Sequence, residues 1–245
     1  MIFQMTHSFP KQKTLFEVLK IKKPPETNES KATPETKTST AAIPPHETED
    51  WKYMPGFITK EDITFEDLLA ELQPLVREYF ATIKGKDFAA KRLSCKFSDI
   101  NDQGKIAEST RKVNENALFN YDQVIWHDWS KSPLVSKIRA LLQKALGFKF
   151  DYCLAHLYRN GKDTIGYHSD KEGLNGQIVS ISMGATRKFR FRRMMKKSGY
   201  DYEFQLRCGD CLLMKIGCQW NWVHSVPPEL TINDPRINLT FRMFE

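Results

Sequence analysis

The chain has 245 residues and a formal net charge of +7, a length sufficient for one sizeable hydrophobic core plus a tail. No stretch approaches the roughly 20 consecutive apolar residues of a membrane span, and residues 1–20 lack the apolar run of a secretory signal. The five cysteines are odd in number and unevenly spaced, so we expect reduced thiols, an intracellular protein and no membrane contact. The positive charge is compatible with a polyanionic partner without requiring one.

The N-terminal segment, residues 1–50, is predicted to be a disordered tail. Residues 21–50 are rich in Lys, Pro, Glu, Thr and Ser and hold almost no large apolar groups. Such a segment buries too little surface to offset the entropy of ordering it. The basic run at residues 20–23 favours nuclear entry, although an ordinary solvated charge run has the same composition.

A short amphipathic stretch precedes this basic run, at residues 12–19. It loosely resembles the peptides that bind sliding clamps: Gln12 and Leu15 fit the pattern, while Val18 and Leu19 stand in place of its aromatic pair. A contact with a sliding clamp is therefore one interpretation of these residues. A fraying turn of helix is the other.

The folded part is predicted to span residues 51–245 and to open with a helix. Thr64, followed three residues later by Asp67, has the capping pattern of a helix start. The apolar residues that follow predict a helix running toward Tyr79. Pro74 is expected to kink or break it, because proline cannot donate a helical hydrogen bond.

A second helix has clearer boundaries. Ser132 is a suitable N-cap, Pro133 suits the first helical position and Gly147 suits the end. Between them the apolar side chains recur at helical spacing, at Leu134, Ile138, Leu141, Leu142 and Ala145.

After this helix the pattern changes from helical to strand-like. Seven short runs follow one another, with glycine-containing turns between several of them: 151–158, 178–183, 187–193, 202–206, 210–216, 222–226 and 236–243. Helices first and many short strands afterwards indicate an α+β protein with a double-stranded β-helix (jelly-roll) core backed by N-terminal helices.

The last predicted strand carries a distinctive polar face. Because side chains alternate along a strand, Arg236, Asn238, Thr240 and Arg242 share one face, opposite three apolar residues. Two guanidinium groups with two hydrogen-bonding groups between them suit a small ligand that carries two carboxylates.

A possible metal site lies upstream of that strand. His168 and Asp170 are two residues apart, so in an extended segment they point to the same side, and His224 follows in a later strand. Two imidazoles and one carboxylate form the facial triad of non-haem Fe(II) oxygenases, which leaves positions open for a cosubstrate and dioxygen. The alternatives are a surface histidine with a loop aspartate, or a zinc hydrolase, which would leave the paired arginines unexplained.

An ordered set of motifs extends over residues 90–245. They are Arg92-Leu-Ser-Cys-Lys-Phe97-Ser-Asp99, Leu157-Tyr158-Arg-Asn-Gly161, Ile165-Gly-Tyr-His168-Ser-Asp170, Ser180-Ile-Ser-Met-Gly184-Ala-Thr-Arg187-Lys-Phe189, His224-Ser-Val-Pro227 and Pro235-Arg-Ile-Asn-Leu-Thr-Phe-Arg242. With these motifs in this order the chain resembles the AlkB-like 2-oxoglutarate/Fe(II) dioxygenases, especially their eukaryote-type DNA repair branch.

The resemblance implies a role for each residue of the two polar groups. His168, Asp170 and His224 would hold Fe(II). Arg236 would bind the distal carboxylate of 2-oxoglutarate, with a hydrogen bond from Tyr158, and Arg242 would lie near the carboxylate closer to the metal. Asn238 and Thr240 would complete the pocket. The sequence departs from the family at His156, where the family commonly has Asn, and imidazole can replace one amide hydrogen bond but not both.

The implied reaction is oxidative demethylation. Fe(II), 2-oxoglutarate and dioxygen would remove an N-methyl group from a base such as 1-methyladenine or 3-methylcytosine, releasing succinate, carbon dioxide and formaldehyde. The implied partner is DNA with methylated bases, with RNA as an alternative, and we expect a monomer in the nucleus, or in the nucleus and cytoplasm of a host cell if the source is viral.

Several residues are candidates for contact with nucleic acid. The basic run that begins at Arg187 would meet phosphates, although a solvated basic strand has the same composition. By the resemblance, a nucleotide-recognition lid would enclose the flipped base with Arg92, Phe97, Phe119 and Tyr121, and Glu172 would meet the base edge. The aromatic residues among them could equally belong to the core. Phe88 is a candidate duplex wedge or, more simply, a buried side chain.

Two other classes of function remain open. The chain could be a dioxygenase that acts on RNA or on a protein side chain, or a nucleic-acid-binding module without turnover. His156 is the one residue that favours the binding module, while the intact triad and the two arginines argue against it.

Overall fold

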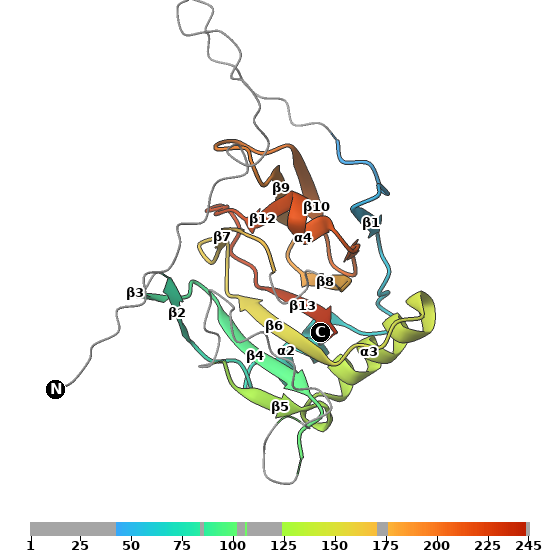
Figure 1. Cartoon of the computed structure of the whole chain (residues 1–245). Helices are drawn as coiled ribbons and strands as arrows, with labels where there is room; N and C mark the ends of the chain where they lie inside the picture. The colour runs from blue at the N-terminus through green and yellow to red at the C-terminus, as the bar shows by residue number, and fades with distance from the viewer. Residues whose placement is uncertain (1–42, 84–85, 102–105, 107–123, 171–175, 244–245) are drawn as a thin grey trace, which may run out of the picture. The chain divides into compact units, whose positions relative to one another are not determined.

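The computed structural model describes residues 43–83, 86–101, 106, 124–170 and 176–243 (Figure 1). Most of the predicted tail, including the clamp-like stretch 12–19, lies outside these residues. So do three of the predicted substrate contacts, Phe119, Tyr121 and Glu172.

Two antiparallel-rich sheets form the core of the described structure. Among the described residues the larger sheet has seven strands, in the order β1 (Trp51–Met54), β11 (Cys211–Met214), β8 (Ile178–Gly184), β13 (Arg236–Arg242), β6 (Tyr152–Tyr158), β4 (Leu93–Ser98) and β5 (Trp126–Asp128). The smaller sheet, counted in the same way, has four: β10 (Tyr202–Leu206), β9 (Arg187–Arg193), β12 (Trp222–Val226) and β7 (Ile165–His168). Buried side chains of both sheets pack into one hydrophobic cluster, so the sheets face each other. This β-rich core is consistent with the predicted jelly-roll.

All seven predicted strand segments are strands, namely β6 and β8 to β13, within one to two residues of the expected ends. The predicted segments did not include β1, β4, β5, β7 or a separate hairpin, β2 (Phe80–Ile83) with β3 (Lys86–Ala89). These strands are three to six residues long. Such short runs show little periodicity, which is why composition alone did not reveal them.

Both predicted helices are present. Helix α2 (Phe65–Leu72) begins at Thr64, whose hydroxyl accepts from the Asp67 amide at 3.2 Å. It ends before Pro74 and does not continue toward Tyr79, because a proline ring in the next turn would clash with a preceding carbonyl. The predicted length was therefore too great.

Helix α3 (Pro133–Leu146) has the predicted boundaries. The Ser132 hydroxyl accepts from the Val135 amide at 3.2 Å, and Gly147 ends the helix with a φ of 76°. Glu71 of α2 also accepts from the Leu134 amide at 3.1 Å, so the first helix helps to cap the second. Two further short elements are the 3-10 helix η2 (Trp129–Lys131) and α4 (Cys218–Asn221).

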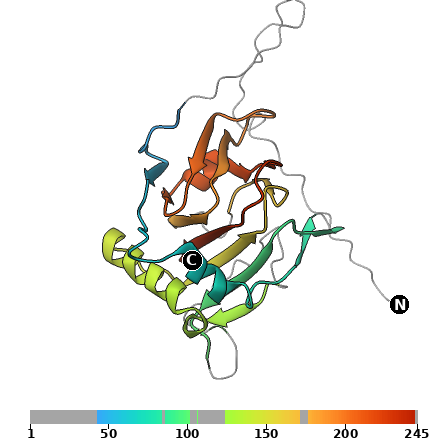
Figure 2. The ribbon, with the colours of Figure 1, turned by 180° about the vertical axis from the view of Figure 1, so that it is seen from behind.

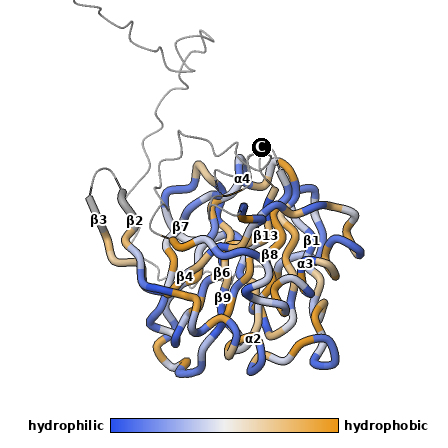
Figure 3. Tube along the Cα trace, turned by 90° about the horizontal axis from the view of Figure 1, so that it is seen from below, coloured by the Kyte–Doolittle hydropathy of each residue, from blue (hydrophilic) through white to orange (hydrophobic). Residues whose placement is uncertain are grey.

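The helices cover one face of the larger sheet. Figures 1 and 2, seen from opposite sides, both show α3 alongside that sheet. Buried residues of α2 and α3, such as Leu68 and Ile138, belong to the same hydrophobic cluster as Ile237, Leu239 and Phe241 of β13. In Figure 3 the strands around β13 and β8 carry much of the orange, hydrophobic colour, while many surrounding loops are blue. The alternate, polar face of β13 is thereby directed away from the helices, toward the smaller sheet. None of the described helices is long and apolar enough to cross a membrane.

Candidate metal centre and its arginine-lined cavity

Three potential metal ligands meet between strands of the smaller sheet. His168 ends β7, Asp170 follows it by two residues, and His224 of β12 is paired directly across from His168. One ligand atom from each of the three residues lies within 4.8 Å of the others. His168 Nε2 is 3.5 Å from one Asp170 oxygen, and His224 Nε2 is 3.8 Å from the other. The structure therefore brings together all three residues that the sequence predicted as ligands.

The surroundings aim the two imidazoles at this point. His168 Nδ1 lies 2.8 Å from the Gly166 carbonyl, which can only accept, so Nδ1 donates to it and Nε2 is the nitrogen that faces Asp170. His224 is buried and stacks on Phe189, with ring centroids 5.3 Å apart. This orientation of a ligand ring through its other nitrogen is common in metal sites.

The charge states of the group suit a divalent cation. Burial would raise the pKa of Asp170, but Arg242 and the two histidines hold it well below its usual value, so the carboxylate is ionised. Burial, followed by the nearby His168, lowers the pKa of His224 to about 3, so its imidazole is neutral. An ionised carboxylate and neutral imidazoles are the forms that bind metals. This donor set fits Fe(II).

Gln219 supports the carboxylate ligand and was not recognised in the sequence. Its side chain is buried in α4, where Oε1 accepts from the backbone N–H of Asp170 at 2.8 Å. Its amide nitrogen faces the sulfur of Met214 at 3.3 Å. A polar residue five positions before a candidate ligand is too weak a signal to identify from one sequence.

A narrow cavity adjoins the ligand group. It is lined by Leu154, His156, Tyr158, Ile165, His168, Asp170, Ser180, Phe189, Met214, His224, Val226, Asn238, Thr240 and Arg242. The predicted polar face of β13 forms one wall, and its neighbours β6 and β8 contribute His156, Tyr158 and Ser180 in register with it. The two polar groups predicted from the sequence are therefore parts of one site.

Arg236 is a buried cation with hydrogen-bonding groups available for an anionic ligand. It is 1% exposed, and one guanidinium nitrogen donates to Ser182 Oγ at 2.8 Å. The other two nitrogens, Nε and Nη1, have no hydrogen-bond partner among the described residues. The guanidinium lies over the ring of Tyr158, 5.3 Å from its centroid. Burial lowers the pKa of Arg236 to about 10, which still leaves it charged at neutral pH.

Arg242, at the end of β13, lies next to the candidate metal ligands. Its guanidinium forms an ion pair with Asp170, with nitrogen and oxygen 2.9 Å apart. Both side chains are buried, so this pair acts in a low-dielectric environment where charges interact strongly. The cation therefore lies beside the candidate carboxylate ligand. A contact of Arg242 with the metal-proximal end of a cosubstrate stays a prediction.

Asn238 and Thr240 are braced by their neighbours. The Asn238 amide nitrogen donates to Ser180 Oγ at 2.8 Å and to the Ile181 carbonyl at 2.9 Å, and its oxygen accepts from Thr240 at 3.3 Å. These contacts fix the orientation of both side chains within the cavity wall.

His156 lines the same cavity. Its Nδ1 is 2.6 Å from Ser94 Oγ. Burial, followed by the charges of Arg92 and Arg242, lowers the pKa of His156 well below its usual value. The ring is therefore neutral and offers one nitrogen to Ser94 and the other to the cavity.

Two predicted substrate contacts are corrected by their positions. Phe97 is 0% exposed on β4 and packs in the hydrophobic core near Trp129, so it cannot reach a base. Arg187 is 1% exposed and is held by Glu229 at 3.2 Å and by three backbone carbonyls of two segments. It is a structural cation. Sequence composition could not show this, because its acidic partner is remote in the chain.

Arg92 and Phe88, two further candidates for contact with nucleic acid, differ in how exposed their side chains are. Arg92 is mostly buried, with its guanidinium 3.3 Å from the Thr164 carbonyl just before β7 and over the ring of Tyr79. Phe88 on β3 is 51% exposed, contrary to the simpler expectation of a buried side chain.

The two facing sheets and the His-Asp-His group define a class of enzyme. A family model described as the 2OG-Fe(II) oxygenase superfamily matches residues 50–242, and the chain belongs to this superfamily. Membership implies Fe(II) and 2-oxoglutarate, so the predicted cofactors and the predicted enzyme class are confirmed.

Within this superfamily the chain is similar to AlkB-like proteins, as two curated relatives show. The chain is 36% identical over 127 residues to the alpha-ketoglutarate-dependent dioxygenase alkB homolog 3 of Bos taurus, across 48% of this chain and 43% of the relative. It is 33% identical over 119 residues to the DNA oxidative demethylase ALKBH2 of Bos taurus, across 45% of this chain and 43% of the relative. The matches thus span less than half the length of these relatives.

A solved structure shows the same fold. The structure of OsALKBH1 aligns with a TM-score of 0.52 at 16% identity, covering 79% of this chain and 98% of that one. At this identity the likeness concerns the fold alone.

Proposed function

We propose that the chain is an oxidative demethylase that repairs N-methylated bases, such as 1-methyladenine and 3-methylcytosine, in DNA. One observation carries the proposal: a group of two histidines and an ionised carboxylate adjoins a cavity lined by Tyr158, and the buried guanidinium of Arg236, which lies over the Tyr158 ring, has two unpartnered nitrogens. This combination suits a metal together with a small dicarboxylate. The choice of DNA is supported by the likeness to the DNA oxidative demethylase ALKBH2.

In this proposal the side chains bind and orient, and the bound group supplies the oxidation. His168, Asp170 and His224 would hold Fe(II), which together with 2-oxoglutarate and dioxygen supplies the oxidant for demethylation. Arg236 would bind the far carboxylate of 2-oxoglutarate through its two unpartnered nitrogens. Succinate, carbon dioxide and formaldehyde would be the other products.

The remaining cavity residues would position the cosubstrate. Tyr158 and His156 would donate hydrogen bonds to it, and Arg242 would place a positive charge near its metal-proximal end. The burial of these groups would exclude water and strengthen each polar contact.

The proposed activity has a direct test. The purified full-length chain is incubated with Fe(II), 2-oxoglutarate and an oligonucleotide containing 1-methyladenine, and succinate, formaldehyde and the repaired base are measured. We expect all three products in equal amounts from the parent chain and none from Asp170→Ala. Succinate without base repair would point to RNA or protein as the substrate, and DNA binding without succinate would point to a binding module.

The cosubstrate pocket can be tested separately through Arg236→Met. Removing the guanidinium should raise the KM for 2-oxoglutarate by at least about tenfold, because a charge-assisted bidentate contact is lost. Stability should be kept or increased, since replacing a buried charge by an apolar side chain of similar volume is often neutral or stabilising. An unchanged KM would place the cosubstrate elsewhere.

Action in the nucleus is part of this proposal, because the proposed substrate is DNA. A monomer, a nucleotide-recognition lid and a sliding-clamp contact through residues 12–19 remain predictions from the sequence. Phe88 remains the candidate wedge, and its exposure on β3 supports that role.

A further inference from the structure

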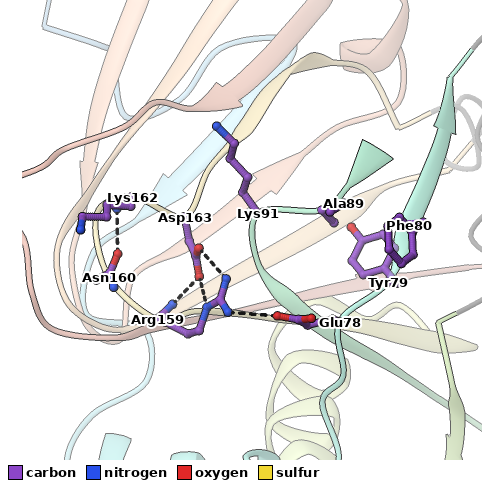
Figure 4. Close-up of a pocket in the computed structure, with 10 residues that line it drawn as sticks. Glu78, Tyr79, Phe80, Ala89, Lys91, Arg159, Asn160, Lys162 and Asp163 are labelled. Carbon is purple, nitrogen blue, oxygen red and sulfur yellow. Dashed lines mark hydrogen bonds and ion pairs between the residues drawn. The ribbon is translucent and has the colours of Figure 1, made fainter. Parts of the chain in front are cut away.

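We propose that a second recess, separate from the metal cavity, binds the phosphate backbone of the strand that flanks the target nucleotide. The recess has a volume of about 620 Å³. It is formed by Tyr79, Phe80, Lys91, Arg159, Lys162 and Asp163, with others, and is shown in Figure 4. This inference rests on the proposed nucleic-acid substrate and adds where the strand is held.

The recess lies close to the metal site along the chain. One wall is the base of the β2–β3 hairpin, and the other is the turn from β6 to β7. The two walls are joined by the Thr164 amide, which donates to the Lys91 carbonyl at 3.0 Å. Figures 1 and 3 both place the hairpin on the side of the molecule where β7 lies.

The spacing to the metal group suits a few nucleotides. Thr164 is four residues before His168, and an extended chain rises about 3.3 Å per residue, so the two are about 13 Å apart. A stacked strand rises about 3.4 Å per nucleotide, so this distance corresponds to a few steps. A target base at the metal would therefore bring its neighbours to the recess.

One cation, Arg159, pairs with both acidic groups of the recess. Arg159 pairs with Asp163 through two nitrogens, at 2.8 and 3.0 Å, and with Glu78 at 3.3 Å (Figure 4). Lys91 and Lys162 are exposed, and neither ammonium group has an ion-pair partner among the described residues. With three cations to two carboxylates, the recess carries a net positive charge.

Three cations of the basic run predicted to meet phosphates are already paired with carboxylates. Arg187 pairs with Glu229, Arg190 with Glu203 at 2.7 Å, and Lys196 with Asp201 at 3.1 Å. A phosphate would have to compete with these carboxylates for each cation. Arg192 and Arg193 have no ion pair among the described residues but lie over the rings of Tyr167 and Trp222. Lys91 and Lys162 meet no competition from a carboxylate within the described structure, so the recess offers a second place where phosphate can bind.

Salt dependence of binding tests this inference. A fluorescent single-stranded oligonucleotide of about ten nucleotides is titrated with the full-length chain and with the double variant Lys91→Gln, Lys162→Gln over a range of salt. Each lost phosphate contact lowers the slope of log affinity against log salt by about 0.7 for a single strand, so we expect a decrease of about 1.4. Affinity at low salt should fall by roughly tenfold.

The matched control removes the same charge elsewhere. Lys144 and Lys149 are exposed at the end of α3 and just after it, away from the hairpin in Figure 1. Lys144→Gln with Lys149→Gln should leave both the slope and the affinity unchanged. Thermal unfolding of both double variants checks that exposed substitutions leave the fold intact.

A short substrate separates this inference from the proposed enzyme. Turnover of a methylated trinucleotide should be the same for the recess variant and the parent, because the trinucleotide does not reach the recess. If the recess variant and the α3 control bind the long oligonucleotide equally, the inference is wrong even when the parent is an active demethylase. A variant that loses binding of polyglutamate but not of the oligonucleotide would also overturn it, in favour of an acidic protein partner. If no variant turns over the trinucleotide, the proposed function fails while the binding result still stands.

Discussion

Gln219 is the side chain that links the Asp170 loop to the element before β12. Its Oε1 accepts from the Asp170 amide at 2.8 Å, and it is 2% exposed. We therefore expect Gln219→Leu to weaken metal binding by about ten- to a hundredfold, the usual effect of losing a partner that orients a ligand.

Titration of the variant with Mn²⁺, followed by calorimetry, measures this effect without turnover. Gln205→Leu on β10 is a suitable control, because Gln205 is exposed and far along the chain from the ligands. Rescue of affinity by Gln219→Glu, which keeps an acceptor oxygen, would separate positioning from simple packing. A variant that loses thermal stability but binds Mn²⁺ like the parent would contradict the expected role.

His156 should make the protein sensitive to acid. Its pKa is well below the usual value in the folded chain, because of burial and then the charges of Arg92 and Arg242, and is near 6.5 in the unfolded chain. As the pH falls below about 6.5 the unfolded chain binds a proton that the folded chain does not, so stability is lost. The loss from one such group approaches about 1.4 kcal/mol per pH unit.

Urea unfolding at several pH values between neutral and mildly acidic, with chelator present, checks the role of His156. The variant His156→Asn should lose less stability on acidification than the parent. His46→Asn serves as the control, since His46 is exposed. Equal slopes for all three proteins would mean that His156 contributes nothing to the pH dependence.

At the scale of elements, Arg187 ties the start of β9 to two turns. Its guanidinium pairs with Glu229 and donates to the carbonyls of Asn160, Asp163 and Pro227. We expect Arg187→Met to lower the free energy of unfolding by roughly 3 kcal/mol, because the change removes a buried ion pair with Glu229 and leaves three carbonyls without their donor.

Denaturant unfolding measures that loss, and oligonucleotide binding at low temperature measures the affinity of the folded fraction. The affinity should be unchanged, since Arg187 does not reach solvent. Arg193→Met on the same strand is the control, because Arg193 is exposed and should cost little stability. A variant that keeps its stability but loses oligonucleotide affinity would restore Arg187 as a phosphate contact.

The strands and the ligand group were predictable because each has a local signature. Alternation located β13 and its polar face, and the paired capping residues located α3. The same reasoning failed where a residue's role depends on a remote partner. Phe97 was assigned to the lid by the family resemblance, and the short strand β4 has no clear alternation that would mark it as core. Arg187 was assigned to phosphate because it opens a basic run, and nothing in its neighbourhood points to Glu229. The Asp170 contact of Gln219 depends likewise on the folding of two distant segments.

At the scale of the molecule, the site is divided between the two sheets. The candidate metal ligands lie on β7, on β12 and two residues after the end of β7, while the arginines that would face the cosubstrate belong to β13. A bound metal together with 2-oxoglutarate would therefore connect the two sheets, whereas either ligand alone would not. We expect Mn²⁺ and 2-oxoglutarate together to stabilise the fold by more than the sum of their separate effects.

Thermal unfolding with each ligand alone and with both tests this coupling. A ligand at a hundred times its Kd stabilises by about 2.7 kcal/mol, which is large enough to resolve. The expected synergy should disappear in Arg236→Met, whereas the response to Mn²⁺ alone should remain. Additive shifts in the parent would show that the two ligands bind independently.

The two faces of the central strand β13 have different roles. Its odd-numbered residues complete the apolar core under the helices, and its even-numbered residues form the polar face that carries both arginines. A slip of one residue would exchange the two faces, pressing guanidinium groups into hydrocarbon and turning leucine toward the cavity. An insertion in this strand should therefore abolish folding and cosubstrate binding together. Residues at the rim of the cavity can consequently vary, and with them the choice of substrate, far more freely than the residues of β13 that would bind the cosubstrate.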